Sequence, residues 1–346
     1  MLVHPLILQP IFRPKVWGGR HLAELLGKAL PPVELIGESW ECADLDASQS
    51  VVAAGPAKDK TLHELIQTWG PALTGHVKLI DGRFPLLLKF LDAAQALSIQ
   101  VHPYAEPGNS PDRQAKPKHE AWYVLKADPG ACIYRGLAPG ATIETLRSTL
   151  TTAPGLVVEQ LRRIPVKAGE AYYVPGGVAH ALGAGVVVAE VQTPSDVTYR
   201  LYDFGRSRPA TDAGLHIDEA LACIREGIDF RPFEKRSHAS SVFTTVTRLI
   251  TCPNFIVEKV RLMEGCEIEI PYAEPVCWMV LAGRGEVVYG RADRQPFKVG
   301  DVVLLPATLK KPRVKAIEDC HWLEVTIPVP SDLADFPRPD ASSLRG

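Results

Sequence analysis

The stretch GEAYYVPGGVAH, residues 169–180, carries the motif that decides the fold of this chain. Gly169 is followed by five residues, then by Pro175, by Gly177 two positions later, and by His180 three positions after that. Glycine and proline at these places indicate a turn, a short strand and a tight corner. The corner delivers His180 at the start of the next strand, where its imidazole can point into the interior of a β-barrel.

A weaker copy of this motif lies in the second half of the chain. Gly300 is followed by five residues and by Pro306, but Thr308 stands in place of the second glycine and Lys311 in place of the histidine. The frame of the motif is kept, whereas its metal-ligand candidate is lost. The two motifs predict two related β-barrels, of which the first binds a metal and the second serves structure or oligomer contacts.

The turn residues predict a mostly β fold. The 30 prolines and 27 glycines separate short runs rich in valine, isoleucine, leucine and tyrosine. Helical periodicity is confined to 61–69, 142–151 and 216–227, each opening near a Thr or Asp that can cap a helix. We expect these helices to lie at the periphery of the sheets.

Strand patterns gather in two sets, at 84–192 and at 241–327. The segment from about 228 to 240 is polar and interrupted by proline, which is typical of a linker. We therefore expect a metal-binding catalytic domain at 1–235 and a second β domain at 236–346.

Composition limits the classes of partner. Of the 346 residues, 46% are hydrophobic and 23% charged, and the formal net charge is −2, as in globular proteins. No basic run is present, so nucleic acid is not expected as a partner.

The apolar N-terminal patch is broken by Pro5, Pro10 and Pro14, which argues against a membrane span or signal peptide. We expect a cytoplasmic protein, monomeric or homodimeric.

A metal in this chain would be bound by nitrogen and oxygen. The seven cysteines are scattered, odd in number and nowhere spaced as C-x-x-C, which indicates reduced thiols. The stretch LSIQVHP, residues 97–103, offers other donors, because Ser98, Gln100 and His102 share one face if it forms a strand. Polar side chains on the inward face of an otherwise apolar strand are candidate ligands.

The motif at 169–180 resembles the second motif of the cupin family, small jelly-roll barrels that bind a divalent metal. Gln100 and His102 stand where that family has two histidines, and Glu120 supplies the carboxylate on the next strand. Across residues 10–206 the chain is similar to the short bacterial type I mannose-6-phosphate isomerases. The segments that carry this similarity are VWGGRHL, IGESWE, LLLKFLDAAQALSIQVHP, KHEAWYVL, PGGVAHALGAG and AEVQTPSDVTYRLYDFGR.

The resemblance implies an all-β fold of two cupin-like jelly-roll barrels with a few peripheral helices. It also implies a Zn²⁺ ion held by Gln100, His102, Glu120 and His180. The residue types agree with this set, because two imidazoles and one carboxylate suit zinc, and a neutral amide leaves the ion more electrophilic than a second carboxylate would.

The implied reaction interconverts mannose 6-phosphate and fructose 6-phosphate through an enediol, which requires stabilised negative charge on oxygen and a positioned acid or base. The resemblance places Arg200 over the active site. Lys118 shares a face with Glu120 if both lie on one strand, and is a candidate for moving protons. Glu190 and Asp196 are candidates for positioning substrate or transferring a proton, and the identity of the base stays open.

Lys89 is a charged residue in the apolar run LLLKFLD, and buried lysines have anionic partners. The resemblance implies that Lys89 and Ser98 bind the 6-phosphate, with Arg200 sharing it. The alternative is a structural ion pair between Lys89 and Asp92 or another carboxylate.

Two other functions are compatible with a cupin barrel. One is a metal-dependent oxygenase with Fe(II), against which Gln100 argues by filling a position that such enzymes leave open. The other is a non-catalytic sugar-phosphate-binding module, which loss of a metal ligand or of Arg200 would favour. Neither loss is found, so the sequence favours an isomerase, with another aldose phosphate or unphosphorylated mannose as alternative substrates.

Overall fold

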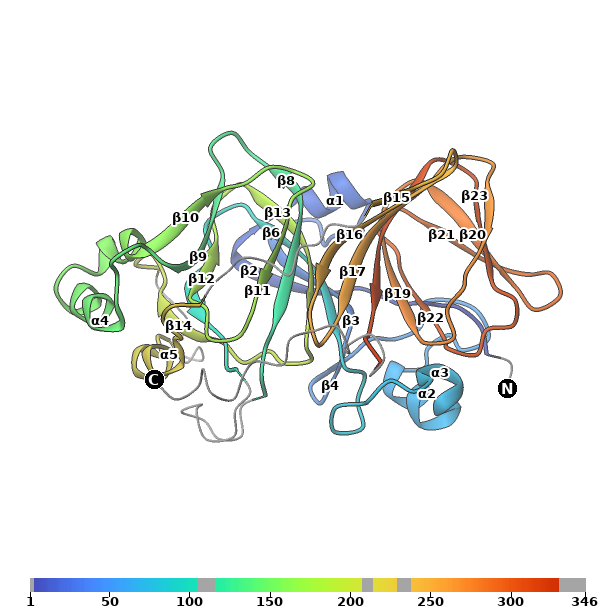
Figure 1. Ribbon diagram of the computed structural model, residues 1–346, viewed down its shortest axis with the longest axis horizontal. Helices are drawn as coiled ribbons and strands as arrows, with labels where there is room; N and C mark the ends of the chain where they lie inside the picture. Colours follow the sequence, from blue (N-terminus) through green and yellow to red (C-terminus); the bar gives the residue numbers. More distant parts are fainter. Residues whose placement is uncertain (1–2, 105–115, 207–213, 229–237, 330–346) are drawn as a thin grey trace.

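The structure, a computed structural model, describes residues 3–104, 116–206, 214–228 and 238–329. Its strands form two antiparallel β-barrels that lie side by side (Figure 1). Each barrel is built from one large and one smaller sheet, so the predicted all-β, two-barrel fold is confirmed.

In the first barrel a six-stranded sheet faces a five-stranded sheet. The six-stranded sheet has the order β11 (Ala171–Val174), β8 (Glu120–Ala127), β13 (Val186–Gln192), β6 (Leu87–Ala93), β3 (Ile36–Cys42) and β2 (Ile11–Gly19). The five-stranded sheet has the order β10 (Leu161–Pro165), β9 (Cys132–Leu137), β12 (His180–Leu182), β7 (Ile99–Val101) and β14 (Tyr199–Tyr202).

The second barrel combines a seven-stranded and a four-stranded sheet. The larger has the order β1 (Leu6–Ile7), β22 (Val302–Leu305), β19 (Val276–Ala282), β24 (Cys320–Thr326), β17 (Ile256–Leu262), β16 (Thr244–Thr251) and β15 (His238–Ser240). The smaller has the order β18 (Glu267–Glu269), β23 (Arg313–Ala316), β20 (Arg284–Tyr289) and β21 (Asp293–Lys298). A separate ribbon joins β4 (Asp44–Leu45) to β5 (Ser48–Gln49).

The three predicted helices are confirmed and lie at the periphery (Figure 1). They are α2 (Leu62–Trp69), α4 (Ile143–Thr152) and α5 (Ile217–Cys223), the last shorter than expected. Thr61 and Thr142 cap α2 and α4 as predicted, each accepting a backbone N–H three residues on. Short helical turns that lack a long apolar repeat were not predicted: α1 (His21–Leu26), α3 (Pro71–Thr74) and the 3₁₀ turn η1 (Pro154–Gln160). None of the helices in the described part of the chain is long and apolar enough to cross a membrane.

The first strand pattern of the set at 84–192, which covers residues 84–102, is in fact two strands, β6 and β7, joined by a turn. The strands β2 and β3 were not predicted, because Pro14 and the charged residues of β3 hide their alternation. Both strands matter for function, since they form one wall of the pocket described below.

The two large sheets pack face to face, so their strands are buried on both sides. On β24, Trp322 points into the second barrel, whereas Leu323 and Val325 belong to the core between the barrels. On β13, Val188 points into the first barrel and Ala189 into the same shared core. This double burial explains why these strands read as continuous apolar runs.

The boundary predicted near residue 236 lies outside the described residues, and the division at 235 stays a prediction. The first strand, β1, pairs with β22 at the edge of the seven-stranded sheet of the second barrel. The backbone N–H of Ala307 also donates to the carbonyl of Leu73, between α3 and the second barrel, at 3.1 Å. N-terminal segments thus contribute to both barrels.

A tryptophan–glutamate pair recurs in the two barrels. Trp122 on β8 lies opposite Glu190 on β13, and its indole N–H donates to Glu190 Oε2 at 3.0 Å. Trp278 on β19 lies opposite Glu324 on β24 and donates to Glu324 Oε2 at 2.9 Å. The same pair on matching strands supports the predicted relationship between the barrels.

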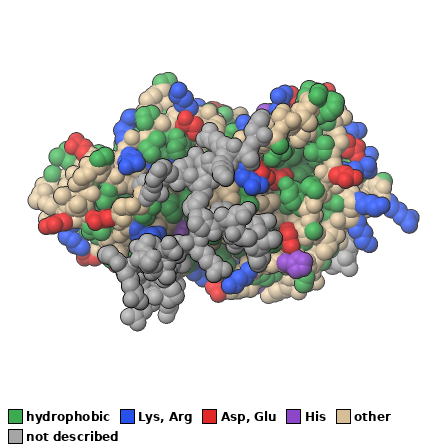
Figure 2. Space-filling model, in the orientation of Figure 1, with side chains coloured by type: hydrophobic (Ala, Val, Ile, Leu, Met, Phe, Trp, Pro, Cys, Tyr) green, Lys and Arg blue, Asp and Glu red, His purple; other side chains and the backbone are tan. Residues whose placement is uncertain are grey.

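The second barrel has no metal-ligand cluster among the residues that the structure describes. Lys311, at the position matching His180, is exposed and has a positive φ of 47°. The interior holds Trp278 and Trp322 instead, with ring centroids 4.8 Å apart. On the face shown in Figure 2, acidic and basic side chains are interspersed.

Candidate active site

Three strands of the first barrel bring His102, Glu120 and His180 together. His180 and Gln100 are direct cross-strand partners on β12 and β7, His102 follows β7, and Glu120 begins β8. His102 Nε2 lies 3.3 Å from Glu120 Oε2, and His180 Nε2 lies 3.2 Å from Glu120 Oε1. Each of the three residues is at most 1% exposed. These are the ligand types and the spacing of a buried metal site.

The backbone orients both imidazoles toward this centre. His102 Nδ1 donates to the carbonyl of Val197 at 2.9 Å, and His180 Nδ1 donates to the carbonyl of Val178 at 2.8 Å. Because Nδ1 holds the proton, Nε2 presents its lone pair to the centre, as in metal-bound histidines.

The centre leaves polar atoms unpaired, which supports a metal. His102 Nε2 and both carboxylate oxygens of Glu120 are buried without a hydrogen-bond partner. Burial, helped by Lys118, lowers the pKa of His102 to about 3. Burial alone would raise the pKa of Glu120, but Lys118 and the two histidines outweigh it and hold that pKa well below its usual value. Both shifts favour the metal-binding forms of His102 and Glu120, and the residues present fit a divalent ion.

Gln100 lies at the edge of the same centre. Its side-chain Nε2 is 3.4 Å from His180 Nε2, and rotation of the amide about its last torsion presents the oxygen there instead. The structure thus brings all four predicted ligands together, while the ligand roles stay predictions.

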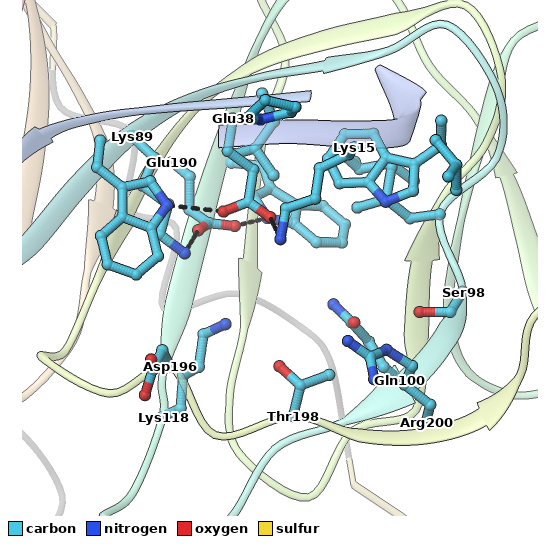
Figure 3. A pocket seen from close by; sticks show the side chains of 18 residues that line it. Lys15, Glu38, Lys89, Ser98, Gln100, Lys118, Glu190, Asp196, Thr198 and Arg200 are labelled. Carbon is cyan, nitrogen blue, oxygen red and sulfur yellow. Dashed lines mark hydrogen bonds and ion pairs between the residues drawn. The ribbon is translucent and has the colours of Figure 1, made fainter. Parts of the chain in front are cut away.

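A cavity of about 480 Å³ opens beside the metal-ligand cluster and is lined by Gln100. Among its walls are four cationic residues, Lys15, Lys89, Lys118 and Arg200, and three acidic ones, Glu38, Glu190 and Asp196 (Figure 3). The four cationic side chains suit an anionic ligand.

The predicted substrate residues all line this cavity. Ser98 is 5% exposed and sits just before β7. Arg200, on β14, is the cross-strand partner of Gln100. Lys118 lies just before β8 and not on it, but its Nζ is 3.4 Å from Glu120 Oε2, so the predicted proximity holds. Asp196 is exposed at the rim.

Lys89 has a carboxylate partner, and that partner is Glu190, with Nζ and Oε1 3.1 Å apart. Asp92, the other partner considered, instead binds His21 at 3.0 Å. Burial alone would lower the pKa of Lys89, but Glu190, Glu38 and Glu120 raise it above its ordinary value. Lys89 is therefore charged, although its side chain is only 5% exposed.

Sequence reasoning missed two charged residues of this pocket, Lys15 and Glu38. Lys15 Nζ lies 3.1 Å from Glu38 Oε1, and the indole N–H of Trp40 donates to Glu38 Oε2 at 2.7 Å. Glu38 and Trp40 are two apart on β3, so alternation would have placed them on one face had that strand been predicted. Nothing in the sequence signals that Lys15, on another strand, completes the group.

Together, fold and site define a two-barrel cupin protein with a candidate metal site in its first barrel and a charged pocket beside it. Residues 6–125 match the family model of the type I phosphomannose isomerase catalytic domain. The chain is 35% identical to mannose-6-phosphate isomerase ManA of Bacillus subtilis, covering 92% of the chain and 98% of the relative. It is also 35% identical to the mannose-6-phosphate isomerase of Streptococcus mutans, covering 89% and 94%.

The crystal structure of the mannose 6-phosphate isomerase from Bacillus subtilis matches with a TM-score of 0.83 at 31% identity, covering 93% of this chain and 99% of that one. The chain therefore belongs to the type I phosphomannose isomerase family of enzymes, and the resemblance seen in the motifs is confirmed.

Proposed function

We propose that this protein interconverts mannose 6-phosphate and fructose 6-phosphate and that it does so with Zn²⁺. The observation that carries the proposal is the buried cluster of His102, Glu120 and His180 beside a pocket lined by four cationic residues. Membership of the family and the names of its relatives supply the substrate. Gln100, His102, Glu120 and His180 would hold the ion.

A zinc ion at this place supplies a Lewis acid for the negative charge that develops on the sugar oxygens. The side chains of the pocket would hold the sugar phosphate beside this ion. Lys89, Ser98 and Arg200 are the proposed partners of the 6-phosphate, because they line one cavity with Gln100. A guanidinium offers five donors and a permanent charge, so Arg200 also suits the neighbouring hydroxyls.

The reaction needs a proton to leave C2 of the open-chain sugar and to return at C1 through an enediol. Lys118, Glu190 and Asp196 are the proposed proton carriers or positioning groups, since each lines the pocket. The carboxylate of Glu190 forms an ion pair with the Lys89 ammonium and accepts a hydrogen bond from the Trp122 indole N–H. These two contacts fix the orientation of the carboxylate. Such fixed groups act without reorganising during the reaction.

The test is turnover of mannose 6-phosphate by the purified protein, measured before chelation, after chelation and after adding back Zn²⁺ or Fe²⁺ in parallel. We expect activity to be lost with the metal and to return with Zn²⁺. Absence of turnover in zinc-loaded protein would refute the isomerase proposal, and recovery with Fe²⁺ alone would refute the choice of zinc.

A further inference from the structure

The pairing between β2 and β3 is interrupted at one wall of the pocket. Strand β2 pairs regularly with β3 until Pro14, which faces Ile36, and pairing resumes only at Gly19, which faces Ile36 again. Residues 15–18 therefore have no register partner on β3, although the backbone N–H of Lys15, at their start, still donates to the carbonyl of Leu35 at 3.2 Å. Irregularities of this kind re-aim side chains beside active sites.

The side chain of Lys15, in this interrupted segment, packs closely against β3. A Cβ atom added to Gly37 on β3 would come within 2.6 Å of both Lys15 Cβ and Trp17 Cζ3. Glycine is thus required at 37 for the Lys15 stem to lie against β3. From there the ammonium group reaches Glu38 inside the pocket.

The three lysines of the pocket differ in how easily each can leave its carboxylate. The side chains of Lys89 and Lys118 are each 5% exposed, and their partners Glu190 and Glu120 are 4% and 1% exposed. Withdrawing either lysine would leave a buried carboxylate without that cation, which is strongly unfavourable. The Lys15 side chain is 36% exposed, which allows it to move.

Glu38 also tolerates the loss of Lys15. Its carboxylate still accepts the Trp40 indole at 2.7 Å. Burial would raise the pKa of Glu38, but Lys89 and then Lys15 lower it to about 2, so Lys89 is the larger of the two cationic influences. Glu38 therefore keeps a donor and a neighbouring cation when Lys15 turns away.

We propose that Lys15 is a specificity-determining residue that leaves Glu38 to bind the phosphate group of the substrate. This inference rests on the proposed function. Lys89 is already engaged by Glu190, and a phosphate dianion needs further positive charge. Figure 3 shows Lys15 on the wall facing Gln100, Thr198 and Arg200, so a ligand between these walls meets cations from both sides.

The experiment compares wild type with Lys15→Gln, Lys15→Arg and the control Lys126→Gln. Lys126 is also a partly exposed lysine paired with a carboxylate, that of Asp128, but it does not line the pocket. For each zinc-loaded variant, KM and kcat are measured with mannose 6-phosphate. The dissociation constant of inorganic phosphate is measured by calorimetry.

We expect Lys15→Gln to raise both KM and the phosphate dissociation constant about tenfold or more, as loss of a charged hydrogen bond predicts, with little change in kcat. Lys15→Arg should retain most of the affinity, and Lys126→Gln should behave as wild type. Unchanged KM and phosphate affinity in Lys15→Gln would overturn the inference, as would an equal loss in Lys126→Gln.

The phosphate titration separates this inference from the proposed function. If the wild type binds phosphate but does not convert mannose 6-phosphate, the isomerase proposal fails while the role of Lys15 in phosphate binding is still decided by the calorimetry. If the wild type turns over mannose 6-phosphate and Lys15→Gln matches it in both constants, only the inference on Lys15 fails.

Discussion

Glu38 illustrates how the charge of one buried residue depends on neighbours from elsewhere in the chain. Its side chain is 13% exposed, and Lys15, Lys89 and Trp40 surround it. Burial by itself favours the protonated acid, yet the two lysines and the indole reverse that preference. The carboxylate is therefore ionised throughout the physiological range and contributes to stability.

The sign of its pH dependence follows from the folded pKa of about 2 against the ordinary 4.5. As the pH falls below the pKa of Glu38 in the unfolded chain, the unfolded chain takes up a proton before the folded protein does. The stabilisation by ionised Glu38 is therefore fully present above the unfolded pKa and is lost as the pH falls toward the folded pKa. Between pH 6 and pH 3 we expect wild type to lose about 2 kcal/mol more free energy of unfolding than Glu38→Gln. Urea unfolding of the metal-free protein measures this difference.

A control for that measurement is Glu159→Gln, which removes an exposed carboxylate. It should lose stability with acid as steeply as wild type does. If the free energy of unfolding of Glu38→Gln fell with pH as steeply as that of wild type and of Glu159→Gln, Glu38 would not be held ionised by its neighbours.

At the scale of single elements, the start of helix α2 follows directly from the sequence. Thr61 accepts the N–H of Glu64 at 3.1 Å, and the Glu64 carboxylate accepts the N–H of Thr61 at 2.8 Å, which forms a complete capping box. Its buried residues Leu62, Leu65, Ile66 and Trp69 follow the helical period.

We expect Thr61→Ala to lower the free energy of unfolding by about 1 kcal/mol, because a helix N–H then loses its acceptor. Thr68→Ala on the same helix is the matched control, since the Thr68 hydroxyl only donates to the Glu64 carbonyl within the helix. Urea unfolding followed by circular dichroism checks both variants. Equal stability of Thr61→Ala and wild type would mean that the cap contributes nothing.

An interrupted ladder hides a strand from sequence reasoning. β2 breaks its ladder at Pro14 and was not predicted, whereas β7, with only three residues, was suggested by the alternation of Ser98, Gln100 and His102. Such elements hold their shape through neighbouring strands and not through local preference. They are also the elements that position Gln100, His102 and Lys15.

At the scale of the whole molecule, one apolar core joins the two barrels. It contains Leu88 and Phe90 from the first barrel and Val257, Leu323 and Val325 from the second. Each of these side chains is at most 4% exposed. The barrels should therefore unfold together, because separating them exposes a face of each large sheet.

Leu323→Ala tests this coupling. We expect a loss of about 2–5 kcal/mol in the free energy of unfolding, in a single transition seen equally by tryptophan fluorescence and circular dichroism. Val33→Ala is the control, since Val33 is 91% exposed. Two separate transitions, or a loss as small as that of the control, would show that the barrels are independent.

The sequence alone predicted the fold class and, for a local physical reason, the inward direction of Gln100, His102 and His180, whereas Glu120 entered the candidate ligand set through the resemblance to the cupin family. Alternation along a strand puts Ser98, Gln100 and His102 on one face, and the glycine–proline corner places His180 at a strand start. These signals lie within a dozen residues, where backbone geometry dictates direction.

Only the tertiary structure decided which distant charges meet. It paired Lys89 with Glu190 instead of Asp92, brought Lys15 to Glu38, and attached β1 to the second barrel. Such pairings depend on strand order and on an interruption in one ladder, and no local pattern encodes them. The candidate metal ligands are thus predictable from the sequence, whereas the charge distribution of the pocket beside them arises from the packing of the sheets.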